Sequence, residues 1–305
     1  MQLKSKLSTE LKKCLFALSN LPLSLYAQQS NLVPAPFLLG ANYQLPSDLD
    51  DGSELSRASF RANVSVPFHR SDSLFLGGTL SYQFDSYDFS DNGILADPWG
   101  DIQRARFSLV GKGEFSSNWS WLFLPNFGFN QESGALLEDS FSFGAIGAAW
   151  SRLNDALTIG GGFVTNYNLE DEFFAFPILV IDWNITETIS FTTMPPPGLQ
   201  PSPSASLNWQ ASPQLTLSLI YQYQIEQQRL SDSVSARVPN GIGELRQHRL
   251  ALSAGFHLTK HIELIAHGGY SLGGTLELLD PNGREVEKQD LEGAAFFGVE
   301  ANYRF

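Results

Sequence analysis

The chain has one cysteine, Cys14, and only 19 Lys+Arg against 32 Asp+Glu in 305 residues, which gives a formal net charge of −13. A single thiol excludes an internal disulfide framework. The shortage of basic residues argues against nucleic-acid binding, because no basic stripe is available to displace the counterions of phosphates.

Long apolar runs are also missing. A membrane-spanning helix needs about 20 apolar residues, and the best run after the N-terminus, 173–181, is about half as long and contains Pro177. What the chain has instead is 23 Phe and 26 Gly, a composition that favours strands and turns over helices.

The N-terminus has the features of an export signal. Lysines at positions 4, 6, 12 and 13 precede an apolar run, 14–27, that ends on Ala27. The run is too short to span a bilayer and Pro22 interrupts it, which weakens the alternative of a buried helix. We expect a signal peptide over 1–27, a short N-terminal segment over 28–36 and one β-barrel domain over 37–305. The mature chain would then be cysteine-free, with a net charge of (19 − 4) − (32 − 1) = −16.

The rest of the chain alternates apolar and polar residues with a period of two, which predicts β-strands. In 57–68, for example, Phe60, Val64 and Phe68 share one parity while Arg57 and Arg61 share the other. A soluble sandwich would alternate in the same way, so this pattern alone does not indicate a membrane.

The lengths of the connections separate the two cases. Short turns near 69–72, 116–118, 152–155, 185–188, 211–214 and 259–261 are interleaved with longer connections near 46–53, 90–101, 131–139, 169–172, 194–203, 230–242 and 279–291. This asymmetry is typical of up-and-down transmembrane barrels, with short periplasmic turns and long outer loops.

The final strand gives a second indication. One parity of 295–305 is apolar or aromatic and ends on Tyr303 and Phe305, the pattern of a terminal strand that the outer-membrane assembly machinery reads. We therefore predict a closed antiparallel up-and-down barrel in the bacterial outer membrane, with twelve strands as the alternative to fourteen. The fourteen strands are expected near 37–45, 54–69, 73–89, 102–116, 119–130, 140–151, 156–168, 173–185, 188–195, 203–210, 214–229, 243–259, 262–277 and 292–305.

A resemblance supports this prediction. Through 177–183, 203–215, 244–246, 268–270 and 302–305, the chain resembles an uncharacterised family of bacterial outer-membrane β-barrel proteins, known as a domain of unknown function. The resemblance implies the barrel and supplies no catalytic residue.

The polar parity of the strands is expected to line the lumen. One interpretation is a selectivity wall across a water-filled pore, and the other is a network of ion pairs that fills and stiffens the barrel. The lumen-lining candidates are Arg57, Arg61, Asp85, Arg104, Arg106, Gln222, Gln224 and Glu226.

The long connections carry much of the acid. They would bind divalent cations that bridge to lipopolysaccharide, repel anionic solutes, or simply form a solvated surface. Residues 48–52 do not match a calcium loop, because the glycine comes one position early. We expect no metal, no cofactor and no catalytic residue, and His248 is the one candidate for an envelope lipid hydrolase.

The leading hypothesis is a porin-like passive channel or transporter for small solutes. The alternative is a non-conducting structural or surface-interaction barrel, and a lipid hydrolase comes third. The expected partners are outer-membrane lipid, lipopolysaccharide, the barrel assembly machinery and a small solute, with no nucleic acid.

Overall fold

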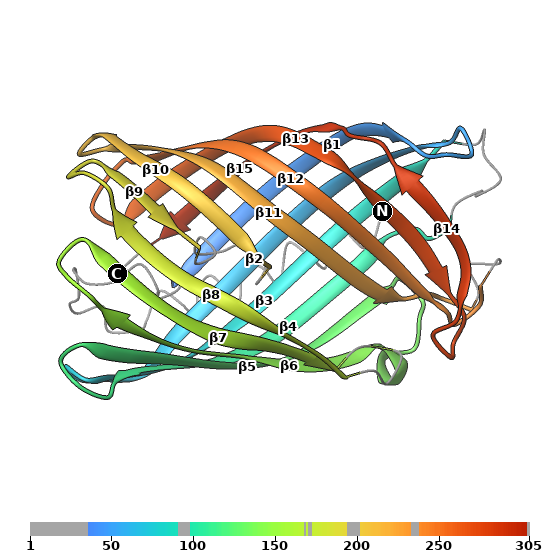
Figure 1. The fold of residues 1–305 in the computed structure, drawn as a ribbon. Coiled ribbons are helices and arrows are strands. Elements are labelled where there is room, and N and C mark those ends of the chain that lie inside the picture. Colours follow the sequence, from blue (N-terminus) through green and yellow to red (C-terminus); the bar gives the residue numbers. More distant parts are fainter. Residues whose placement is uncertain are drawn as a thin grey trace, which may run out of the picture. The chain divides into compact units, whose positions relative to one another are not determined.

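Nearly all of the described chain lies in one sheet that closes on itself (Figure 1). The computed structural model describes residues 36–90, 98–167, 169, 173–193, 202–232 and 238–303. A 3₁₀ turn, η1 (Leu137–Ser140), is the one helical element in this part of the chain. The strands are β1 (Phe37–Asp48), β2 (Glu54–Arg70), β3 (Leu74–Phe89), β4 (Ile102–Glu114), β5 (Trp119–Glu132), β6 (Phe141–Arg152), β7 (Leu157–Tyr167), β8 (Phe173–Asn184), β9 (Ile189–Thr192), β10 (Ser204–Ser212), β11 (Leu215–Arg229), β12 (Ile242–His257), β13 (Ile262–Leu279), β14 (Glu285–Leu291) and β15 (Ala295–Tyr303).

Successive strands pair antiparallel, and the pairing of β1 with β15 closes the barrel. β15 pairs with the first part of β13, up to Tyr270, and β14 pairs with the rest of β13, from Gly274. β14 and β15 therefore form one interrupted wall, and the predicted fourteen-strand barrel is confirmed.

Two predicted long connections are shorter than expected. The connection over 279–291 contains β14, in which five of the seven residues (EVEKQDL) are polar and occupy both faces, so the strand carries no alternating apolar signal. β1 continues to Asp48, which reduces the next connection to Leu49–Ser53. Both differences arise because these strands extend past the apolar belt, where periodicity no longer marks them.

Large apolar side chains point outward all around the barrel. Phe60, Leu80 and Phe107 on three successive strands are 45%, 59% and 42% exposed, as the apolar parity predicts. Trp119, Trp183 and Trp209 are also exposed, and all three lie near the short turns. No helix in the described ranges is long and apolar enough to cross a membrane.

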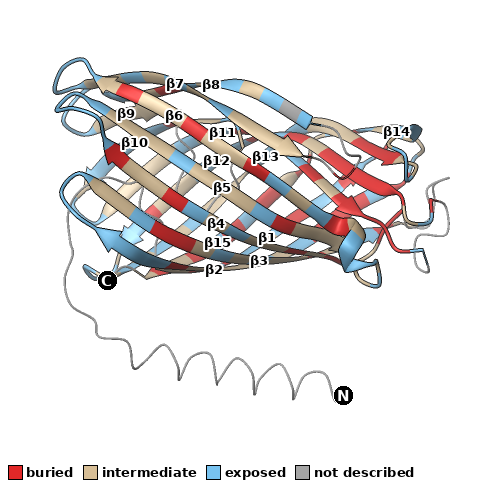
Figure 2. Ribbon diagram, turned by 90° about the horizontal axis from the view of Figure 1, so that it is seen from below, coloured by how far each residue is buried: buried red, intermediate tan, exposed pale blue. Residues whose placement is uncertain are grey.

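The two ends of the barrel differ. At the end with the longer connections, β11 continues seven residues past its last pairing with β10, from Gln222 to Arg229. Arg229 then pairs in parallel with Gln131 of β5, across the ends of β6–β10. The strand ring at this level consists of β1–β5 and β11–β14, nine strands instead of fourteen. We refer to this as the narrow end, and buried residues concentrate there (Figure 2).

Candidate functional site

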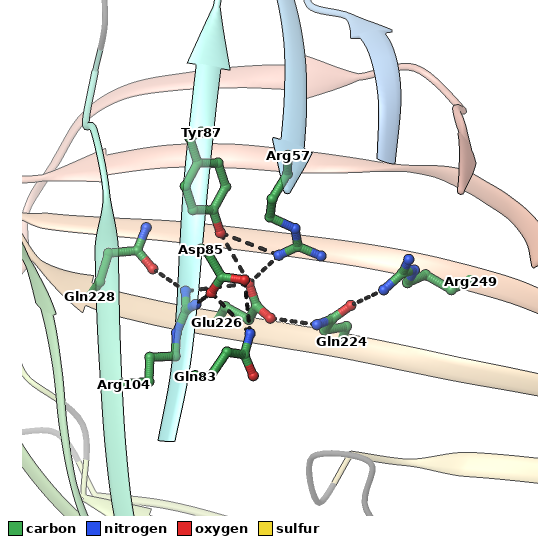
Figure 3. A network of polar contacts seen from close by, with 9 residues as sticks. All are labelled: Arg57, Gln83, Asp85, Tyr87, Arg104, Gln224, Glu226, Gln228 and Arg249. Atoms are coloured by element: carbon green, nitrogen blue, oxygen red, sulfur yellow. Dashed lines mark hydrogen bonds and ion pairs between the residues drawn. The ribbon is translucent and has the colours of Figure 1, made fainter. Parts of the chain in front are cut away.

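A network of charged and amide side chains crosses the lumen between β2–β4 and β11–β12 (Figure 3). Its centre is Glu226, which is 3% exposed. The Oε2 atom of Glu226 accepts hydrogen bonds from Arg57 Nη1 at 2.6 Å and from the Tyr87 hydroxyl at 3.3 Å. Arg104 Nη2 lies 3.4 Å from the same oxygen. These strands are not neighbours in the sheet, so the network connects opposite walls through side chains alone.

The remaining members of this network satisfy the other charges. Asp85, which is fully buried, is ion-paired with Arg104 and accepts hydrogen bonds from Gln83 Nε2 at 2.9 and 3.0 Å. Gln228 accepts a hydrogen bond from Arg104 Nη2 at 3.0 Å. A buried charge persists only when it is paired and hydrogen-bonded, so this arrangement is held by its partners on both walls.

Arg249 of β12 completes the network. It donates from Nη1 to Gln224 Oε1 at 3.2 Å, and Gln224 in turn donates to Glu226. The guanidinium of Arg249 stacks over the ring of Phe296 at 3.7 Å, a cation–π contact that fixes its plane. We call this set the polar network, and its members are Arg57, Gln83, Asp85, Tyr87, Arg104, Gln224, Glu226, Gln228 and Arg249.

An apolar core lies directly beyond the polar network, inside the narrow end. Trp99, which is 1% exposed, packs edge-on against Tyr87 and Phe89 at centroid distances of 5.8 and 5.7 Å. A Cβ atom on Gly243 would lie 2.7 Å from the Trp99 ring, so glycine is needed there for this close approach. We call this core the apolar cap, and it consists of Leu49, Leu55, Tyr87, Phe89, Trp99, Ile102, Leu230, Val238, Leu245, Leu276, Leu278 and Leu291.

Tyr87 belongs to both regions. Its ring packs in the apolar cap, while its hydroxyl contacts Arg57 and Glu226. A buried tyrosine needs a polar partner for its hydroxyl, and this one finds its partners where the core ends and the charges begin.

Two buried charged residues hold the connections over the apolar cap. Arg229 donates to the carbonyl oxygens of Asp139, Leu169 and Asn240, at 2.9, 3.0 and 2.9 Å respectively. Glu132 accepts the backbone N–H of Gly100 at 2.7 Å and that of Ser231 at 2.8 Å. These residues belong to connections far apart in the sequence, so the two side chains hold these connections together at the narrow end.

The other predicted lumen candidates surround the network. Arg61 donates to Glu300 Oε1 at 2.6 Å, and Gln222 lines a cavity that borders the polar network. Arg106 is half-buried and shares the strand parity of Arg104. Of the eight predicted residues, the structure brings Arg57, Asp85, Arg104, Gln224 and Glu226 into one cluster.

The sequence interpretation missed several residues of this site. Arg249 shares a parity with Gln247, Ala251 and Ser253, against Leu250 and Leu252, so its direction was available from alternation. Arg229, Glu132 and Trp99 lie at strand ends or in a connection, where alternation gives no signal.

His248 does not have the contacts expected of a hydrolase. It lies on the exposed face of β12, where its Nδ1 atom is hydrogen-bonded to the Tyr221 hydroxyl at 2.8 Å and its ring stacks on Tyr223 at 4.7 Å. Its contacts are thus with tyrosines on β11, whereas an acyl-transfer site requires a nucleophile beside the histidine.

The connection between β13 and β14 is an ordered turn over 280–284 that begins with Asp280. The carboxylate of Asp280 accepts the backbone N–H groups of Arg284 at 3.0 Å and Asn282 at 2.8 Å, which hold the pKa of Asp280 below its usual value. Lys288 of β14 donates to Glu277 at 2.6 Å, and this contact raises the pKa of Lys288. Within the described ranges, no group of three or more His, Cys, Asp or Glu side chains is arranged to hold a metal ion.

Some predicted features fall outside the described residues, namely the signal peptide over 1–27, most of the segment over 28–36, and Phe305. Tyr303 is described and ends β15, where it pairs with Phe37 of β1 and Ile262 of β13.

Residues 101–298 match the model of a family described as a domain of unknown function, DUF6268. No curated protein matches the chain. Among solved structures, an outer-membrane channel from Pseudomonas putida F1 is 9% identical, with a TM-score of 0.49 over 92% of this chain and all of that one. The NanC porin is 9% identical, with a TM-score of 0.39 over 88% of this chain and all of that one. A FadL homologue from Pseudomonas aeruginosa is 11% identical, with a TM-score of 0.43 over 88% of this chain and 90% of that one. None of these likenesses indicates a function at such identities and TM-scores.

Proposed function

Because the chain belongs to the DUF6268 family of uncharacterised proteins and folds as a closed barrel, we propose that it is a bacterial outer-membrane channel for small solutes whose narrow end is closed by the apolar cap. The observation that carries this proposal is the distribution of side chains, which are apolar outside the barrel and charged inside it.

The exterior supports a membrane location. In hydrocarbon every backbone N–H and C=O group needs a partner within the protein, so strands span a membrane only as a closed barrel. The exposed tryptophans near the short turns fit one interfacial aromatic girdle, and exposed Tyr221 and Tyr270, further along their strands, fit the other. Short turns then face the periplasm, and β15 with Tyr303 is the strand offered to the assembly machinery.

The narrow end faces outward in this orientation. Its polar extensions, such as β14, would stand above the lipid and meet lipopolysaccharide. Solute passage would require the apolar cap and the polar network to move. The hydrogen bonds of Arg229 and Glu132 to the backbone of the connections would oppose this movement.

Single-channel recording in planar bilayers tests the proposal. Wild type should be mostly closed with brief openings, and Arg229→Met should open far more often. Hydrogen bonds to a charged group contribute about 1.5–3 kcal/mol each, so the loss of three should increase the open-to-closed ratio more than tenfold. Arg152→Met, at an exposed arginine beside a short turn, should behave like wild type. If neither wild type nor Arg229→Met gives any current, the proposed channel function is wrong.

A second candidate function is a non-conducting barrel that acts as a structural or surface-interaction component of the envelope. The buried apolar cap over the polar network favours this candidate. It predicts no current from any cap variant, together with envelope defects when the connection over 280–284 is deleted.

A further inference from the structure

A cavity of about 140 Å³ lies in the lumen against the polar network. Its walls come from β1–β3, β11–β13 and β15. The side chains that line it include two acceptors, Asn42 and Glu300, as well as a set of donors and a set of apolar groups. Arg57, Arg61, Arg249, His267 and Gln222 supply hydrogen-bond donors, whereas Ile220, Ile265 and Phe296 supply an apolar surface.

Two hydrogen-bond donors of Arg249 have no partner. Its side chain is buried, at 7% exposure, yet both Nε and Nη2 have no hydrogen-bond partner. Nε of Arg61 is also buried without a partner. Buried donors are normally satisfied, and an unsatisfied one costs free energy, so these atoms point to an acceptor that belongs in the cavity.

The charge around the cavity has the sign that such an acceptor requires. Four arginines belong to the polar network or line the cavity, namely Arg57, Arg61, Arg104 and Arg249, and they face three carboxylates, Asp85, Glu226 and Glu300. The difference is 4 − 3 = +1 before His267 is counted, in a chain whose net charge is −13. Among the described residues, Glu300 is the one carboxylate that lines the cavity, and its charge is balanced by Arg61 at 2.6 Å.

We infer that this cavity binds the carboxylate of a small organic acid, with Arg249 as the main contact. The role of that acid as a transported solute rests on the proposed channel function, but the binding does not. An engineered cavity of similar volume, about 150 Å³, holds benzene, so a ligand of about six non-hydrogen atoms fits. The carboxylate would take the free donors of Arg249, and a short hydrocarbon body would lie against Ile220 and Ile265.

Isothermal titration calorimetry on the full chain in detergent tests the inference. Butyrate has the required size, and butyramide is a neutral analogue of the same shape. Butyrate should bind at least about tenfold more tightly than butyramide, since charge-assisted hydrogen bonds are roughly twice as strong as neutral ones. Equal affinities, or no binding of butyrate, would overturn the inference without any variant. Inorganic phosphate that binds more tightly than butyrate would overturn the assignment to a carboxylate.

Variants then locate the site. Arg249→Met should reduce butyrate affinity about tenfold or more. Arg246→Met is the matched control, because this arginine lies on the same strand with the opposite parity and contacts Glu244 outside the cavity. Loss of binding in both variants, or in neither, would contradict the assignment to Arg249. If Arg249→Met fails to give the heat-modifiable band of a folded barrel, Arg249→Lys replaces it, and its affinity should also fall because an ammonium cannot bind a carboxylate bidentately.

The calorimetry needs no current, which separates the two proposals. A barrel that binds butyrate but never conducts would support the site and contradict the channel. A barrel that conducts but does not bind butyrate would support the channel and contradict the site.

Discussion

The apolar cap and the cavity lie in the same barrel and are built differently. The apolar cap, which includes Trp99, consists of side chains that are at most 7% exposed, whereas guanidinium groups with unsatisfied donors line the cavity. Strand number explains the contrast. A ring of about eight strands has an interior that side chains can fill, and diameter grows with the number of strands. Nine strands surround the apolar cap and fourteen form the full barrel, so one region is packed and the other keeps space for water or a ligand.

The largest effect should come from the boundary between these regions. Glu226→Met leaves Arg57 and Arg104 buried without their shared counterion, and breaking a buried ion pair costs about 3–5 kcal/mol of unfolding free energy. Urea unfolding in lipid vesicles would measure the loss. Glu187→Met, at an exposed turn, is the control, and an equal loss in the two variants would mean that the polar network does not stabilise the barrel.

A smaller effect is expected within the apolar cap. Leu276→Ala removes a fully buried side chain and should cost about 3 kcal/mol, because the packed ring of strands can only partly fill the void. Leu137→Ala removes the same atoms from the turn η1, outside the lipid-facing strands, where that leucine is 55% exposed, and should cost less than about 1 kcal/mol. Comparing urea midpoints of the two variants measures the contrast, and similar values would show that the interior of the narrow end is not a packed core.

The smallest effect should lie outside both regions, in the turn at Asp280. The folded pKa of Asp280 is lowered by N–H donors in its own turn, so its stabilising contribution is present above the unfolded pKa of about 3.9 and is lost as the pH falls through the folded pKa. Hydrogen exchange at the amides of Asn282 and Arg284, corrected for intrinsic rates, should show protection at pH 6 that weakens near pH 3. Asp280→Asn should lose the pH dependence while both core regions stay unchanged, and a persistent dependence would assign it to another group.

Much of the fold could be predicted because lumen and exterior impose a period of two on each strand. The alternation of Phe60 with Arg61, for example, gives the direction of both side chains without any knowledge of the partner strand. β14 could not be predicted in this way, since most of its residues are polar and these occupy both faces. The pairing of β5 with β11 could not be predicted either, because it depends on how far each strand extends.

The same limit applies to the site. Alternation places Arg57, Arg104 and Glu226 on the inner face, but it does not show that residues 169 and 122 positions apart meet across the lumen. Their pairing follows from the closure of the sheet and the register of its strands. Alternation also predicts that Arg249 points into the lumen, whereas its donors without a partner can be identified only in the folded structure.

The parallel contact between Gln131 and Arg229 has a consequence for biogenesis. It joins positions 98 residues apart (229 − 131), with six consecutive strands, β6–β11, between its ends. Loop-closure entropy makes such distant contacts slow to form, and this one needs both flanking walls already in place. The narrow end should therefore form last, after the barrel has inserted into the membrane. Until this contact forms, a newly assembled barrel would let solutes through its lumen.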